Sequence, residues 1–286
     1  MNKQINQEEL AFGVCSVSTL SRIENNTQHP SRAVYEKLMQ RMGLSPEIFP
    51  SFYSERELDL FQLKHRINQA LIKEQYNKAE RLTNKMQQAK SLEPIYKQLV
   101  KYVDAIISFQ KGDNPVQTAK AMHRVVSMSI KDCSADKLLS QIFTLDELSM
   151  LRMLALTQYQ AGKHNDGIDL LYGLKDYIER KVVDNKGVSP MYTLILHTLS
   201  SWVGMQGNID EALKLCEIGL QRCVEYGAYF SFAGLLYNKG YSLVKLRRDD
   251  EARKYLQEAF YFARAQGNQT YVEHIANFAT TNGIEL

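Results

Sequence analysis

The chain has 286 residues, more than one ordinary domain of about 100–200 residues, so its length predicts two structural units or an array of repeats. Hydrophobic residues make up 44% and charged residues 23%, and no apolar run approaches the roughly 20 residues that cross a bilayer. The first residues form no apolar signal segment, and four scattered cysteines do not suggest a disulfide framework. These features exclude membrane-spanning and secreted proteins and predict a cytoplasmic location. The net charge of +3 neither requires nor excludes nucleic acid as a partner.

Helix signals dominate the chain, and strand signals are nearly absent. There is no sustained alternation of apolar and polar residues and no Asn-Gly hairpin turn. A capping residue followed by proline, which is typical of a helix start, occurs at Ser45-Pro46, Asn114-Pro115 and Ser189-Pro190. The sequence therefore predicts an all-α fold.

The sequence also predicts an array of repeats. Five times a polar turn is followed by a helix that opens around a small residue, and these residues lie 40, 48, 45 and 40 positions apart: Ala79, Ala119, Gly167, Ala212 and Ala252. A small residue recurs there because the two helices of a hairpin approach closely. Gly240, Leu256 and Ala259 complete the tetratricopeptide pattern in the last repeat. We therefore expect five tetratricopeptide-like repeats and a closing helix at 269–282, which together form a right-handed superhelix over residues 58–286.

Residues 1–50 differ in kind, because they hold short helical segments separated by polar turns. Asn6 is placed to cap a first helix, and Glu9 to complete a capping box. Ser16 is placed to cap a second helix, whose inner face holds Leu20 and Ile23. Two short helices joined by a tight turn, the second with a polar outer face, describe a helix-turn-helix that reads the major groove of DNA. We place the linker to the array at 51–57.

The two segments Gln7–Ala11 and Ser18–Asn25 resemble the bacterial Xre/Cro-type helix-turn-helix. The usual sequence motif of that family is T-Q-E-E-L-A followed by S-x-x-S-R-I-E-N-G. In that family the glutamine, here Gln7, docks on a phosphate. The reading positions correspond to Val17, Ser18, Ser21 and Arg22. Arg22 is the residue best suited to bind a guanine through two hydrogen bonds. The resemblance implies that operator DNA contacts the segment Ser16–Asn25, so Asn25 belongs to the candidate site.

Two observations oppose DNA binding. The family domain begins with a further helix; because only six residues precede Gln7 here, we expect that helix to be missing. In addition, the acidic and basic residues of 1–50 balance to zero, which weakens the attraction to phosphate. Either the start of the chain is assigned too late, which we favour, or this form has lost DNA binding.

A helix-turn-helix followed by five such repeats resembles the PlcR-type regulators of the Rap, Rgg, NprR, PlcR and PrgX superfamily of quorum sensing. In that family the first helices of the repeats line a groove that binds a short signalling peptide, and binding alters a homodimer and the spacing of its two readers. The peptide-holding amide and tyrosine correspond to Asn238 and Tyr271, and Lys239 lies beside the former. Two further family asparagines correspond to Arg152 and Thr198, which implies a different peptide; an arginine suits a carboxylate.

The sequence offers no support for an enzyme. Six histidines and four cysteines show neither H-E-x-x-H nor paired Cys-x2-Cys spacing, and there is no phosphate-binding loop. We therefore expect no catalytic residues, no metal and no cofactor. The sequence predicts a transcription regulator that binds double-stranded operator DNA and a signalling peptide. The alternative is a tetratricopeptide scaffold or peptide sensor that does not bind DNA and acts through protein–protein contacts.

Overall fold

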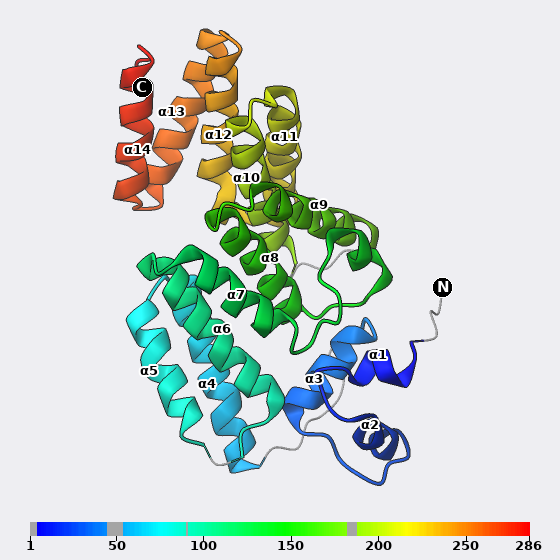
Figure 1. Ribbon diagram of the computed structural model, residues 1–286. Helices are drawn as coiled ribbons and strands as arrows, with labels where there is room; N and C mark the ends of the chain where they lie inside the picture. Colours follow the sequence, from blue (N-terminus) through cyan, green and yellow to red (C-terminus); the bar gives the residue numbers. More distant parts are fainter. Residues whose placement is uncertain (1–4, 45–53, 90, 182–187) are drawn as a thin grey trace. The chain divides into compact units, whose positions relative to one another are not determined.

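The computed structural model describes residues 5–44, 54–89, 91–181 and 188–286, and all regular structure in these ranges is helical. The all-α prediction is confirmed. The chain forms two compact units, Met1–Gly167 and Ile168–Leu286 (Figure 1). No helix in the described ranges is long and apolar enough to span a membrane.

Three short helices open the first unit: α1 (Gln7–Ala11), α2 (Val17–Glu24) and α3 (Arg32–Arg41). The side chain of Asn6 accepts a hydrogen bond from the amide of Glu9, and that of Ser16 accepts one from Thr19. Both predicted capping residues are thus confirmed, and each satisfies an amide that the helix leaves without a partner. Leu20 is buried and Ile23 packs partly buried against the same core, as expected.

Helical hairpins follow in both units (Figure 1). We call the first helix of each hairpin the A helix and the second the B helix. The first unit holds α4 (Glu55–Ile72) with α5 (Tyr76–Gln87), α6 (Pro94–Lys111) with α7 (Pro115–Val126), the short η2 (Ala135–Ser140), and α8 (Leu145–Gln160). Helix α9 (His164–Lys181) runs across the boundary between the units. The second unit holds α10 (Ser189–Met205) with α11 (Ile209–Tyr226), η3 (Tyr229–Ser231), α12 (Phe232–Lys245) with α13 (Asp249–Ala265), and α14 (Gln269–Thr281).

Three helix starts can be compared with the sequence-based predictions: one agrees and two differ. Asn114 caps α7 ahead of Pro115, as predicted. Helix α10 already includes Ser189, so the residue before the helix is Val188 and Ser189 is not the cap. Helix α4 begins inside the segment that we assigned to the linker, because Ser54 and Glu57 form a complete capping box. Residues 51–53 of that linker and Ser45-Pro46 lie outside the described residues.

The recurring small residues lie where the hairpin helices approach most closely. Ala79, Ala212 and Ala252 are fully buried. A Cβ at Gly167 would lie 2.7 Å from the backbone oxygen of Ala155, and one at Gly240 would lie 2.7 Å from the side chain of Leu256. A side chain at either glycine would therefore clash with the partner helix of its hairpin, in agreement with the packing reason given for the repeat pattern.

The helix-turn-helix and the first hairpins share one hydrophobic core. Leu10 and Leu20 of the helix-turn-helix belong to the same buried cluster as Leu63 of α4 and Ile95 of α6. Lys37 of α3 is buried and donates a hydrogen bond to Gln98 of α6 over 3.4 Å. The three short helices are therefore packed on the array in the first unit.

Candidate DNA-reading helix and peptide-binding face

The outer face of α2 is open to solvent. Val17, Ser18 and Arg22 are exposed, whereas Ser21 is half-buried. The guanidinium of Arg22 makes no hydrogen bond or ion pair with any other residue in the described ranges. These side chains therefore form a short polar surface, about two helical turns long, with one uncommitted cation in it.

The other two candidate DNA-binding residues are engaged within the helix-turn-helix. The amide Nε2 of Gln7 donates to the carboxylate of Glu24, which joins the start of α1 to the end of α2. Asn25 ends α2, and its Nδ2 donates to the backbone oxygen of Ser21 over 2.8 Å. Glu24 uses one of the two amide hydrogens of Gln7, so the second remains available to donate to a phosphate.

The charges around α2 are mostly acidic. Residues 5–44 contain four lysines and arginines, and Arg22 is the exposed one among them: Lys37 and Arg41 are buried, and Arg32 pairs with Glu36 at 2.5 Å. The glutamates at positions 8, 9 and 24 are all exposed. The reading surface thus lacks the excess of cations that usually attracts a nucleic acid.

Arg41, at the end of α3, holds the helix-turn-helix to the array. Its Nη1 donates to the backbone oxygens of Glu9, Leu10 and Phe12, where α1 ends, over 2.8–3.1 Å. Its Nη2 binds the carboxylate of Glu147 in α8 at 2.6 Å, and both side chains are almost fully buried. Sequence reasoning missed this pair, and Arg41 entered it only as one of the basic residues in the charge balance of 1–50. No local pattern links residues 106 positions apart.

The predicted peptide-holding amide, Asn238, lies in α12 and points to α10. It is only 6% exposed, and its Nδ2 donates to the backbone oxygen of His197 over 3.0 Å and to Oγ of Ser200 over 2.9 Å. Thr198, on the same stretch of α10, is half-buried and donates its hydroxyl to the backbone oxygen of Leu194. Both amide hydrogens of Asn238 are therefore used between two A helices, and its Oδ1 is the atom left for a ligand.

Tyr271, the predicted tyrosine, belongs to a cluster of aromatic rings between α12 and α14. Its ring lies 5.9 Å from that of Tyr237 and stacks on His274 at 5.8 Å. Phe278 packs against Tyr237 at 5.4 Å and against Tyr241 at 5.5 Å. Burial raises the pKa of Tyr271 above its usual range and that of Tyr237 to about 12, so both hydroxyls stay protonated near neutral pH. We call Tyr237, Tyr241, Tyr271, His274 and Phe278 the aromatic cluster.

Sequence reasoning found only Tyr271 of the aromatic cluster. A signal for the others exists in the spacing, because Tyr237 and Tyr241 are four apart and residues 271, 274 and 278 share one face of a helix. The spacing alone does not reveal that the two faces meet.

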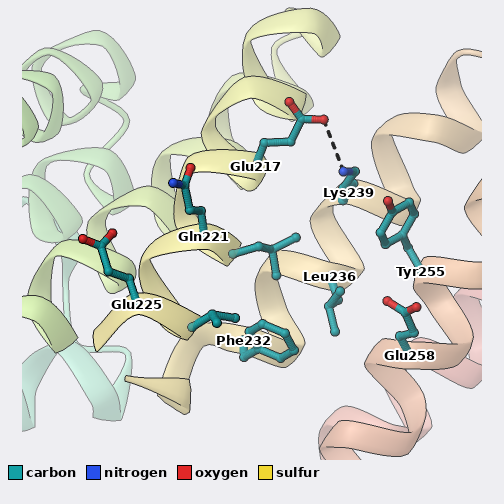
Figure 2. Close-up of a pocket in the computed structure, with 10 residues that line it drawn as sticks. Glu217, Gln221, Glu225, Phe232, Leu236, Lys239, Tyr255 and Glu258 are labelled. Carbon is teal, nitrogen blue, oxygen red and sulfur yellow. Dashed lines mark hydrogen bonds and ion pairs between the residues drawn. The ribbon is translucent and has the colours of Figure 1, made fainter. Parts of the chain in front are cut away.

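Lys239 does not join this group. Its ammonium pairs with Glu217 of α11 at 3.2 Å and lies 4.5 Å from the ring centre of Tyr255 in α13 (Figure 2). Neighbouring residues of a helix point about 100° apart. Lys239 therefore contacts the B helices, whereas Asn238 contacts the A helix α10.

Arg152 lies in α8 of the first unit, whereas the other four candidate peptide-binding residues lie in the second unit. Burial lowers the pKa of its guanidinium. Its one hydrogen-bond contact is with the Sδ of Met153 at 3.8 Å, and no carboxylate in the described ranges pairs with it. A half-buried guanidinium without an anionic partner is a suitable place for a carboxylate of a ligand.

The described residues contain no group of three or more histidine, cysteine, aspartate or glutamate side chains placed to hold a metal ion. The helix-turn-helix family model matches residues 2–49. No curated protein sequence matches the chain. Several solved structures share its fold.

PlcR of Bacillus thuringiensis, solved with the peptide PapR7 and DNA, has a TM-score of 0.68 at 15% identity, over 96% of this chain and 94% of that one. ComR of S. thermophilus, solved with DNA and its signalling peptide, has a TM-score of 0.58 at 15% identity, over 98% and 96%. A kinesin light chain with tetratricopeptide-like repeats from Podosopora anserina has a TM-score of 0.50 at 14% identity, over 76% and 100%. At these identities the likeness establishes the fold. The predicted PlcR-like architecture, a helix-turn-helix followed by tetratricopeptide-like repeats, is confirmed.

Proposed function

We propose that this chain is a PlcR-like transcription regulator whose array binds a short signalling peptide and thereby alters binding to operator DNA. It works in the cytoplasm as a homodimer, with one reading helix on each half-site. One observation carries the proposal. A capped, solvent-exposed helix with an uncommitted Arg22 precedes a tetratricopeptide array, in the same order as in the PlcR and ComR structures that contain DNA and peptide.

In this proposal α2 enters the major groove. Arg22 donates two hydrogen bonds to a guanine, Ser18 and Ser21 bind polar base edges, and Val17 contacts a thymine methyl group. Asn25, at the end of the helix, and Gln7, through its second amide hydrogen, bind the phosphate backbone. Because few cations surround α2, base contacts contribute a larger share of the affinity than in most helix-turn-helix proteins.

The peptide lies along the A helices. The aromatic cluster provides an apolar surface with hydroxyl donors at its edge, which suits an extended peptide with a bulky side chain. Thr198 and the free Oδ1 of Asn238 bind peptide backbone groups. Arg152, in the first unit, is a candidate partner for a carboxylate on the resemblance to the family. We leave Lys239 out of this face, because it pairs with Glu217 and contacts Tyr255 instead.

The second candidate function is a tetratricopeptide scaffold or peptide sensor that does not bind DNA. The acidic surroundings of α2 favour it, because a reader with a single exposed cation in residues 5–44 gains little from the release of counterions.

Fluorescence anisotropy of the full chain on labelled DNA from upstream of its own gene, over a salt series, separates the two functions. A regulator binds this DNA more tightly than a scrambled duplex, and Arg22→Ala weakens that binding by about 1–3 kcal/mol, or roughly 5- to 150-fold. Arg264→Ala is the matched control, since Arg264 is exposed at the end of α13. Equal affinity of the unchanged chain for both duplexes would overturn DNA reading and leave the scaffold function.

A further inference from the structure

A groove in the second unit, between α11, α12 and α13, takes no part in the proposed function (Figure 2). It has a volume of about 690 Å³. Leu220 of α11 with Phe232 and Leu236 of α12 provides apolar lining, and Val224, also in the lining, is 62% exposed. The groove lies on the side of α12 that carries Lys239, and Asn238 is on a different side of that helix.

The apolar surface continues beyond the groove. The ring of Tyr229 in η3 packs against Phe232 with the ring centres 5.6 Å apart, and Tyr229 is itself 42% exposed. The next residue, Phe230, is 61% exposed. A contiguous apolar surface with polar residues around it is typical of a binding site for another protein.

The rim of the groove is acidic. Glu217, Glu225 and Glu258 line it against a single cation, Lys239 (Figure 2). That cation is already committed to Glu217 and the ring of Tyr255. Glu225 is also paired, with Arg222 of the same helix at 2.7 Å. Glu258 is exposed and has no hydrogen-bond or ion-pair partner among the described residues. Because Glu217 and Glu225 are paired, the uncommitted carboxylate of Glu258 carries the charge preference of the groove, which favours a basic partner over an acidic one.

The length of the groove indicates the shape of the partner. Glu217, Gln221 and Glu225 follow one another at four-residue spacing on α11, so the rim runs along two helical turns, or about 12 Å. Its apolar lining comes from residues four apart on α11 and on α12, which matches the spacing of apolar residues on one face of a docked helix.

We propose that this groove binds a basic amphipathic helix of a partner protein. Two or three apolar side chains of the partner helix, at positions i, i+3 or i+4, and i+7, pack between α11 and α13 against Phe232, Leu236 and Val224. A lysine or arginine beside them reaches Glu258. The site is separate from the face that carries Asn238 and Tyr271, so a partner and a signalling peptide bind the same array at the same time.

Two labelled synthetic 14-residue helices test the proposal on the full chain by fluorescence anisotropy. Both have leucines at positions i, i+4, i+7 and i+11; one has lysines on its remaining surface and the other glutamates. We expect the lysine peptide to bind and the glutamate peptide to bind at least tenfold more weakly. Glu258→Lys weakens binding of the lysine peptide by about three- to tenfold, and Val224→Asp weakens it as well.

Glu273→Lys is the matched control, because it makes the same change of charge at an exposed glutamate on α14, outside the groove. The substituted glutamates are exposed, so both variants should keep the helical circular dichroism of the unchanged chain. Equal losses from Glu258→Lys and Glu273→Lys would show attraction to net charge alone and overturn the proposal. Equal binding of the two peptides would overturn it too. A dimer in sedimentation that Val224→Asp dissociates would show that a second copy of this chain occupies the groove, and would overturn the assignment to a basic partner.

Discussion

The amide of Asn238 is committed inside the array before any ligand binds. Its Nδ2 holds the backbone oxygen of His197 and the hydroxyl of Ser200 in a buried position between α10 and α12. Removing a donor from buried acceptors leaves them unsatisfied, which costs about 1–3 kcal/mol. We therefore expect Asn238→Ala to lower the free energy of unfolding by that amount, in addition to any effect on peptide affinity.

Urea denaturation measures the effect of Asn238→Ala, with Thr198→Ala as the control. Thr198 bonds only within its own helix, so its loss should change stability far less. If the two variants had the same midpoint as the unchanged chain, the inward bonds of Asn238 would contribute nothing, and its role would be confined to the ligand.

At the scale of elements, the turns between A and B helices share one backbone conformation. One or two residues after the A helix, φ is positive at Glu74, Gly112, Gly162, Gly207 and Arg247. Glycine adopts this conformation freely, whereas a residue with a Cβ is strained by roughly 1 kcal/mol. Arg247, at φ 60°, is exposed, so Arg247→Gly should raise the free energy of unfolding by about 1 kcal/mol.

The reverse change in an equivalent turn provides the control. Gly207 has φ 90° and open space around its Cα, so Gly207→Ala should lower stability by a similar amount through backbone strain alone. Thermal and chemical denaturation of the two single variants and of the double variant measure both changes. Opposite shifts that cancel in the double variant are expected, because the turns are separate; two shifts of the same sign would contradict the strain argument.

The elements were predictable from sequence where the cause is local. Asn6 and Ser16 cap helices through amides three residues away, and Gly240 is small because Leu256 lies against it in the same hairpin. The direction of a side chain between hairpins is different, because it depends on which helices become neighbours. For this reason the sequence pointed to Asn238 and Lys239 as candidate residues, but it did not predict that Asn238 contacts α10 whereas Lys239 contacts α11 and α13.

At the scale of the whole molecule, the main feature is the attachment of the reading helix to the first hairpins. Arg41 bonds to the end of α1 and to Glu147, and a Cβ at Gly13 would lie 2.3 Å from the Cα of Ser129. Ser31, which caps α3, donates to Glu93 over 2.8 Å. The reader cannot turn on the first hairpins without breaking these buried contacts, so it moves together with them.

Glu147→Gln tests this attachment selectively. Glutamine keeps the size of the side chain and can complete the capping box with Thr144, as Glu147 does, but it leaves the buried Arg41 without its anion. Uncompensated buried charge costs about 3 kcal/mol, so the variant should unfold more easily, and amide hydrogens of α1–α3 should exchange faster than in the unchanged chain. Arg248→Ala breaks an exposed ion pair with Glu251 and should leave both readouts nearly unchanged. Unaltered exchange in α1–α3 would mean that the contacts of Gly13 and Ser31 hold the reader without the ion pair. Faster exchange restricted to α1–α3, with the hairpins unaffected, would identify Arg41 and Glu147 as the contact that holds the reader to the hairpins of the first unit.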